Sequence, residues 1–483
     1  MQFAPILRIL GMLLMIFSLS MLPPIFVSLY YNDGALGPFM VGFGITLLTG
    51  LCIWASTYSS NQELKTQDGF LVVALFWTVL SLFASIPFML DLGCHLSFVD
   101  AYFESVSGLT TTGATVLSDL QRLPRSILYY RQQLEFLGGM GIIVLAIAIL
   151  PMLGIGGMQL FRAETAGPIK NTKLKPRMKE TAKALWSIYV GLTVCCAFAF
   201  WLSGMDLFDA ITESFGTVST GGFSTHDESL GYYHSQAVNL IAVFFMFMGA
   251  VNFALHFQFM QQKKISLYFK DPEFRVYVMI LVTAIAITML TLMLARPIES
   301  DLQDFLNSLF MVVSMSTTTG AFTRDVNDWP TFLPYLMMFM AIVGGCAAST
   351  TGGIKIIRVM IIRAQGVREL NRLIHPRAVL RTKLGEHVLA ENVIQAVWGF
   401  VSVFLTLFIA LILVLIALGL DFKTAFGAVA ACLSNTGTGI GDVAINFVKI
   451  PDSSKWILLF AMLAGRLEIF TLMVLFMPSY WRR

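Results

Sequence analysis

Long apolar runs separated by short polar segments make up most of the chain. A membrane-crossing helix needs roughly 20 mostly apolar residues, and ten runs meet this condition. They lie at 7–30, 38–57, 69–90, 127–153, 184–203, 236–260, 276–295, 332–362, 393–419 and 456–478. The first run contains Pro23-Pro24 and has no small-residue cleavage site, so we interpret it as a retained helix rather than a removed signal peptide. The pattern predicts an all-α polytopic membrane protein.

Basic residues are concentrated in three of the segments between these runs, at 155–183, 261–275 and 363–392. By contrast, 204–235 contains no Lys or Arg. Because short cytoplasmic loops are enriched in Lys and Arg, the three basic segments are predicted to be cytoplasmic, with both termini on the same side. They are typical of ordinary positive-inside loops, and they are equally suited to binding a partner subunit or anionic lipid.

Composition narrows the function classes. The chain is 57% hydrophobic and only 13% charged, about half the charged share of roughly a quarter in soluble domains. A formal net charge of +3 argues against nucleic-acid binding, and the six cysteines form no C-x-x-C pair. The six histidines form no H-E-x-x-H, and the spaced glycines at 437–441 lack the lysine of a phosphate loop. An enzymatic function is therefore not predicted.

Four stretches between the apolar runs repeat one pattern, at 97–115, 206–224, 304–322 and 421–440. They align without gaps on four glycines, Gly113, Gly222, Gly320 and Gly437. Sixteen residues before each glycine stands Ser97, Asp206, Asp304 or Asp421, and each glycine follows a Ser/Thr-rich tripeptide. The glycines are 109, 98 and 117 residues apart, and each interval contains two predicted spans. This is a fourfold internal repeat.

Each feature of the repeat has a physical reason. Ser or Asp at the start is a helix N-cap, and the next twelve or so residues make a helix of roughly 18 Å, about half of a 30 Å hydrocarbon core. The negative end of that helix then lies near the bilayer centre and favours a cation. We expect the tetrapeptide ending in glycine to return outward in extended form, with its carbonyls lining a water-filled cavity.

Four such segments around one axis give rings of carbonyl and hydroxyl oxygens that replace the hydration shell of an alkali cation. Helix packing through small residues is the alternative for any one stretch, but four ungapped copies argue against it. The predicted filter glycines are Gly113, Gly222, Gly320 and Gly437. The predicted ion-binding residues are Thr111, Thr112, Thr220, Gly221, Thr318, Thr319, Asn435 and Thr436.

The motifs SGLTTTGAT, GGFSTHD, GGCAASTTGG and AGRLEIFT closely resemble those of the TrkH family, the membrane subunits of bacterial Trk potassium-uptake systems. This family belongs to the superfamily of KtrB and plant HKT transporters. The resemblance covers essentially the whole chain, including two N-terminal spans that KtrB-type relatives lack. It implies four M1–pore helix–filter–M2 repeats, a homodimer with one pore per protomer, and a cytoplasmic ring of TrkA subunits that bind nucleotide. It implies no cofactor in this chain, with potassium as the substrate.

The resemblance also divides the chain and suggests its selectivity. We expect two additional N-terminal helices over 1–68 and pore repeats over 69–160, 161–265, 266–385 and 386–483. In the superfamily, serine at the first filter glycine accompanies sodium permeation and four glycines accompany potassium selectivity; all four are glycine here. Potassium and rubidium uptake across the bacterial inner membrane is the expected function. A sodium-permeable or poorly selective cation transporter is the alternative, and a polytopic membrane enzyme or a scaffold without transport is remote. Channel-like and proton-coupled flux stay open.

Two departures from regular symmetry are visible. The second filter reads Thr220-Gly221-Gly222 where Thr-Thr-Gly is expected, so it lacks one hydroxyl, and the fourth contains Asn435. Glu104 and Glu213 each stand nine residues before their glycine, where the other repeats have Met311 and Ala428. These glutamates are expected to form hydrogen bonds behind the filter or to tune its field.

A glycine-rich stretch interrupts the eighth apolar run between residues 344 and 353. Glycine costs about 1 kcal/mol in a helix interior, so its four glycines with Ser and Thr between them should break the helix. Close helix packing is the alternative interpretation. The resemblance implies a gate below the filter. The predicted gate residues are Gly344, Gly345, Ser349, Thr350, Thr351, Gly352, Gly353 and Arg466.

Arg466 lies inside the last apolar run, with Glu468 nearby. A charge at this depth is costly and usually faces a cavity or a partner. A structural salt bridge or an arginine that reaches to the membrane interface is the alternative. Family resemblance places this arginine beside the gating loop, where its charge would oppose a permeating cation. Glu468 is not expected to neutralise it, because residues two apart on a helix face differently.

Overall fold

The computed structural model of the chain describes residues 3–58, 66–91, 93–94, 96–144, 174–295, 302–378, 380–385 and 387–482. The end of the run predicted at 127–153 and most of the basic segment at 155–183 lie outside these residues. The described residues are predominantly helical, and their only strands are the paired dipeptides β1 (Lys383–Leu384) and β2 (His387–Val388). The predicted all-α class is confirmed.

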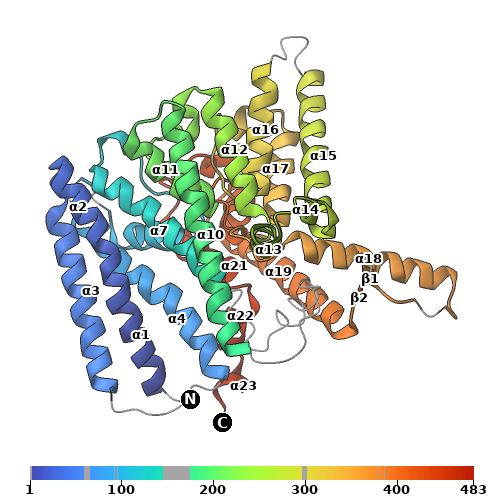
Figure 1. The fold of residues 1–483 in the computed structure, drawn as a ribbon, viewed down its shortest axis with the longest axis horizontal. Helices are drawn as coiled ribbons and strands as arrows, with labels where there is room; N and C mark the ends of the chain where they lie inside the picture. The colour runs from blue at the N-terminus through green and yellow to red at the C-terminus, as the bar shows by residue number, and fades with distance from the viewer. Residues whose placement is uncertain are drawn as a thin grey trace.

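The N-terminal helices pack beside the rest of the molecule (Figure 1). They are α1 (Phe3–Ser18), the short 3₁₀ helix η1 (Leu19–Met21), α2 (Leu22–Tyr31) and α3 (Leu36–Thr57). Pro23 and Pro24 stand in the first turn of α2, where the missing amide hydrogens cost little. A Cβ at Gly11 or Gly50 would lie 2.9 Å from the other's carbonyl oxygen, so these glycines allow α1 and α3 to pack closely.

After these helices, one order of elements recurs four times: a long helix, a short helix, a glycine-containing segment and a second helix (Figure 1). The first set contains α4 (Thr66–Ala84), α5 (Ile86–Leu90), α6 (Phe98–Leu109), η2 (Leu120–Arg122) and α7 (Arg125–Val144). The second contains α10 (Leu174–Leu202), α11 (Leu207–Ser219), η4 (Ser229–Tyr233), α12 (Gln236–Ala250) and α13 (Phe253–Gln262), followed by α14 (Ser266–Lys270).

The third and fourth sets follow the same order. The third contains α15 (Pro272–Ala295), α16 (Leu302–Ser316), η5 (Val326–Asp328), α17 (Phe332–Val343) and α18 (Ile356–Ile374). The fourth contains α19 (Glu391–Ala417), α20 (Phe422–Leu433), η6 (Gly441–Val443), α21 (Asp452–Arg466), α22 (Phe470–Met473), η7 (Val474–Phe476) and α23 (Pro478–Trp481). The exact repeat boundaries stay a prediction, and the one at 160/161 lies outside the described residues.

The second helix of each set packs against two short helices. Helix α7 contacts α6 and α11, α12 contacts α11 and α16, α17 contacts α16 and α20, and α21 contacts α20 and α6. This order returns to its starting point, so the short helices form a closed group of four. The marks for the two termini lie at one end of the molecule (Figure 1). Which side of the membrane that end faces stays a prediction.

Three of the predicted spans are not continuous helices. Among the described residues, six helical segments are long and apolar enough to cross a membrane, or eight if two bent pairs each count as one span. The bends are 96° between α12 and α13 and 113° between α21 and the helices after it. Helix α17 ends at Val343, and α18 starts only at Ile356. This break includes the glycine-rich stretch at 344–353, where one was predicted; the other two breaks were not predicted.

Candidate ion-binding site

The short helices begin at the predicted caps in three of the four repeats. Ser97 accepts a hydrogen bond from the amide of Asp100 (3.2 Å), Asp206 from that of Phe208 (3.2 Å), and Asp421 from that of Thr424 (3.1 Å). The prediction for Asp304 is wrong, because α16 already begins at Leu302 and Asp304 lies in its first turn.

All four short helices end in the same hydrogen-bonded turn, which the sequence analysis missed. The residue directly before each glycine donates its amide hydrogen to the carbonyl five residues earlier, as in a Schellman motif. These bonds are Thr112 to Ser107 (2.8 Å), Gly221 to Gly216 (2.9 Å), Thr319 to Ser314 (2.9 Å) and Thr436 to Ala431 (2.8 Å).

The residue two before each glycine is left-handed, with φ of 48° at Thr111, 54° at Thr220, 54° at Thr318 and 55° at Asn435. The predicted extended conformation is therefore wrong at these positions. Left-handed backbone is rare for a β-branched residue, and such strain costs about 1–3 kcal/mol and collects at functional sites. Asparagine tolerates this conformation best among non-glycine residues, which gives a physical reason for Asn435.

The four filter glycines interlock with one another around a ring. Their φ values are all positive, from 73° to 92°. A Cβ at any of them would lie less than 3.0 Å from a carbonyl oxygen of the neighbouring filter segment. That carbonyl belongs to the residue directly before the neighbouring segment's glycine. The pairs are Gly113 with Gly221, Gly222 with Thr319, Gly320 with Thr436, and Gly437 with Thr112. The sequence of contacts closes on itself, so the four segments surround one axis and leave no room for side chains at the glycines.

Hydroxyl groups support three of the four segments. Thr112 pairs with Thr110 (Oγ1–Oγ1 2.7 Å), Thr319 with Thr317 (2.8 Å), and Thr436 with Ser434 (Oγ1–Oγ 2.8 Å). The second segment has Gly221 at this position and forms no such pair. Asn435 further links the fourth segment to the first, because its Nδ2 donates to Thr112 Oγ1 over 3.0 Å. These contacts hold neighbouring backbones at fixed distances.

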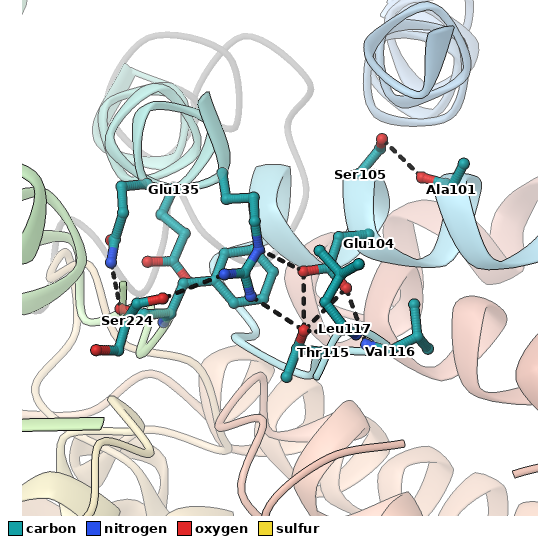
Figure 2. Close-up of polar contacts among 11 residues, drawn as sticks. Ala101, Glu104, Ser105, Thr115, Val116, Leu117, Glu135 and Ser224 are labelled. Carbon is teal, nitrogen blue, oxygen red and sulfur yellow. Dashed lines mark hydrogen bonds and ion pairs between the residues drawn. The ribbon is translucent and has the colours of Figure 1, made fainter. Parts of the chain in front are cut away.

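Buried glutamates brace the outer ends of the first two segments, and Figure 2 shows the one in the first segment, Glu104. Glu104 accepts hydrogen bonds from the Thr115 hydroxyl (3.0 Å) and the Val116 amide (2.9 Å). Glu213 accepts the equivalent bonds from the Ser224 hydroxyl (2.7 Å) and the Thr225 amide (2.8 Å). These are hydrogen bonds behind the predicted filter, one of the two roles expected for the glutamates.

Arg131 of α7 joins these two braced segments. Its Nε lies 2.7 Å from Glu104 Oε1, and both side chains are fully buried. Its Nη2 donates to Thr115 Oγ1 (3.0 Å) and its Nη1 to the Ser224 carbonyl (3.1 Å). Breaking a buried pair of this kind by removing one partner costs about 3–5 kcal/mol. The signal available in the sequence was a charged residue inside a predicted span, followed there by Gln132, Gln133 and Glu135.

The loop between α17 and α18 folds back under the short helices. Gly344 and Gly353 have φ of 72° and 76°, and the amides of Ile354 and Ile356 donate to the carbonyls of Ile342 (2.9 Å) and Gly345 (3.0 Å), which closes the neck of the loop. The predicted loop residues Ser349, Thr350, Thr351 and Gly352 are buried with it.

This loop contacts the inner ends of the filter segments directly. Thr350 Oγ1 lies 3.1 Å from Thr220 Oγ1, and the Gly352 amide donates to Thr318 Oγ1 over 2.8 Å. A Cβ at Gly352 would overlap the carbonyl oxygen of Ser434. The structure therefore brings the predicted gate and the predicted filter together. The loop occupies the space next to the left-handed residues of three segments.

Arg466 ends α21 and reaches this loop. Its Nη1 donates to the Thr350 carbonyl (3.0 Å) and its Nη2 to the Gly138 carbonyl of α7 (3.4 Å), and its side chain is buried. Glu468 pairs instead with Arg358 of α18, over 2.6 Å. Among the described residues, no carboxylate lies within ion-pair distance of Arg466. Its positive charge is thus held under the filter by carbonyl groups.

Glu273, near the start of α15, holds the same loop from the other side and was missed in the sequence. Its Oε1 accepts hydrogen bonds from the amides of Ala347 (2.8 Å) and Ile357 (3.2 Å), and the side chain is buried. It therefore secures both the loop and the first turn of α18. Its separation in sequence from both amides left no local signal for this role.

Comparisons with known proteins show what the whole chain is similar to. The family model described as TrkH, cation transport protein, matches residues 37–483. The chain is 51% identical to the Trk system potassium uptake protein TrkH of Vibrio parahaemolyticus and 49% identical to that of Escherichia coli, and each alignment covers 100% of both chains. It is 41% identical to Escherichia coli TrkG, over 98% of this chain and 97% of TrkG. The crystal structure of the potassium transporter TrkH from Vibrio parahaemolyticus superposes with a TM-score of 0.92 at 49% identity over 100% of both chains.

Proposed function

Because the chain belongs to the TrkH family of cation transport proteins, we propose that it conducts potassium and rubidium ions across the bacterial inner membrane. The family is one of multi-pass membrane transport proteins and not of enzymes. One observation carries the proposal: four short helices end at one closed ring of four glycines and four carbonyl groups. The negative ends of these helices favour a cation, and the ring supplies oxygens to replace its hydration shell.

The direct test is ion flux through the purified chain in liposomes, with potassium, rubidium, sodium and a pH gradient varied separately. We expect potassium and rubidium to pass and to compete with each other. Sodium should neither pass nor compete with them. Equal sodium flux would favour the alternative of a poorly selective cation transporter. Potassium flux that requires a proton gradient would identify coupled transport, and flux without one would identify a channel.

We further propose that residues 344–353 and Arg466 form the gate of this pathway. Three contacts support it: the loop lies next to the Thr220 and Thr318 hydroxyls, its neck is closed by backbone hydrogen bonds, and Arg466 binds its Thr350 carbonyl. A unit charge about 4 Å from a cation costs roughly 4 kcal/mol at an effective dielectric of 20. Hence Arg466 opposes conduction while it remains under the ring.

The cytoplasmic side is proposed to bind a TrkA-type nucleotide-binding ring, and the chain to act as a homodimer with both termini in the cytoplasm. Helix α18 projects from the body of the molecule (Figure 1). Near its end it carries apolar residues that are largely exposed: Leu370 (63%), Leu373 (79%) and Ile374 (69%). Exposed apolar groups of this size favour contact with another protein. Light scattering of the chain in detergent, with and without the candidate ring subunit, tests both assemblies.

A further inference from the structure

The second filter segment lacks the side chain that supports the other three. In those segments a threonine stands directly before the glycine and pairs with a hydroxyl two residues earlier, at 2.7–2.8 Å. Gly221 has no side chain to place there. A glycine at this position would leave the segment with a gap behind it and with a more mobile backbone.

The carboxyl group of Glu135 occupies that space. A Cβ at Gly221 would lie 2.7 Å from Glu135 Oε1 and 2.5 Å from its Oε2. Glu135 comes from α7 and is fully buried. Its Oε1 accepts a hydrogen bond of 2.9 Å from the amide of Phe223, the residue after Gly222. Its Oε2 has no hydrogen-bond partner among the described residues. This carboxyl group therefore faces the backbone of the second segment.

Two of the other second helices, α12 and α21, have apolar residues at the corresponding place. Gly138 of α7, Gly249 of α12 and Gly465 of α21 each approach a carbonyl at the end of a short helix. Three residues before these glycines stand Glu135, Met246 and Met462. The glutamate thus belongs to α7, which packs against α11. Helix α11 is the short helix that leads into Gly221-Gly222. Gly221 and Glu135, the two residues that depart from the repeat, are therefore in contact with each other.

We propose that Glu135 is a positioning residue for ion selectivity, which replaces in the second filter segment the threonine side chain of the others. Its carboxyl group fills the space behind Gly221, and its Oε1 fixes the Phe223 amide. The segment then keeps the backbone position that the ring of carbonyls requires. Removal of the carboxyl group leaves a cavity and an unpaired buried amide. This inference rests on the proposed function of the ring as a cation filter.

A side-chain exchange tests the proposal. Gly221→Thr alone places a side chain against the carboxyl group, and Glu135→Ala alone removes the support. Each single variant should lower the potassium-over-sodium flux ratio in liposomes at least tenfold. The double variant should recover at least threefold over either single variant, because the threonine then fills the space behind the segment and pairs with Ser219 as in a regular segment, while the Phe223 amide remains without its acceptor. Gly221→Thr combined with Met246→Ala is the matched control and should show no recovery.

The outcomes separate the two claims. If the unmodified chain does not select potassium, the proposed function fails. If it selects potassium and the double variant is no better than the worse single variant, only the role of Glu135 fails. Recovery with Met246→Ala would also overturn that role, because it would be unspecific.

Conservative variants decide the question if the exchange variants do not fold. Glu135→Gln keeps the shape and the acceptor for the Phe223 amide and should stay within about threefold of the unmodified flux ratio. Glu135→Leu has similar volume without an acceptor and should lower the ratio at least tenfold. Equal ratios for the glutamine and leucine variants would overturn the proposal.

Discussion

The filter ring and the loop below it are both rich in glycine and both lie outside regular helix, yet they are held in different ways. Each filter segment is bonded to the end of its own short helix and locked against its neighbour at a glycine. The tip of the loop is held mainly by other elements: by carbonyls of α12, by Thr318, by Glu273 and by Arg466. The first arrangement fixes backbone positions, whereas the second depends on contacts that can be released one at a time.

The largest effect is expected at the four filter glycines, because their locked backbone leaves no space for a side chain. In Gly320→Ser the new Cβ would overlap the Thr436 carbonyl oxygen, and φ of 73° strains any side chain. The potassium-over-sodium flux ratio should fall by about a hundredfold, ~2.8 kcal/mol. Gly113→Ser should behave similarly. Competitive flux in liposomes measures the ratio, and unchanged selectivity in both variants would remove these glycines from the filter.

The second effect concerns the loop through its charged contact. Arg466→Ala removes a buried positive charge and the hydrogen bonds to the Thr350 and Gly138 carbonyls. Potassium flux in liposomes without any partner should rise at least tenfold, and shortening the loop should also raise it. Arg466→Lys keeps the charge and serves as the control. A well-folded alanine variant with unchanged or lower flux would make the arginine structural and end the gate assignment.

A smaller effect is expected on the opposite side of the loop. Glu273→Ala removes the acceptor shared by the Ala347 and Ile357 amides. Because a hydrogen bond to a charged group contributes about 1.5–3 kcal/mol and part of the loop stays anchored, flux should rise about threefold to tenfold. Glu273→Gln retains an acceptor and should resemble the unmodified chain. Rubidium uptake into liposomes measures both variants. Rubidium uptake by Glu273→Ala as low as that of the unmodified chain would show that Glu273 does not hold the gate.

The smallest effect is expected where filter and loop touch. Thr350→Val keeps the side-chain shape but removes the hydroxyl that contacts Thr220 and the Gly249 carbonyl (3.0 Å). One neutral hydrogen bond contributes about 1 kcal/mol, so basal flux should rise only about twofold to fivefold. Thr351→Val, which lies in the same loop and does not contact Thr220, is the control. If both valine variants conduct equally, the contact with Thr220 does not stabilise the closed loop.

Much of this architecture could be predicted because its signals are local. Apolar runs indicated the spans, and Ser97, Asp206 and Asp421 marked the start of short helices. The four-glycine loop at 344–353 indicated a broken helix. These features depend on hydropathy, capping and glycine propensity, which neighbouring residues determine.

The rest depends on contacts between distant parts of the chain. Left-handed threonines contradict local preference and persist only because the surrounding structure fixes them. The bend after Ala250 has a local cap, because the Asn252 side chain accepts a hydrogen bond from the Ala254 amide (2.8 Å). The sequence there contains no run of glycines that would predict a bend. Glu135 and Glu273 act on backbone far away in sequence. The amides that these glutamates bind can be identified only from the folded structure.

In the proposed function, the ring determines which ion passes, and the loop determines how many ions pass. The most direct test is the potassium-over-sodium flux ratio of Arg466→Ala measured beside the unmodified chain in the same liposome preparation. We expect a higher potassium flux with a ratio unchanged to within about twofold. A ratio that falls tenfold or more as the flux rises would contradict it, because selectivity would then depend on the loop.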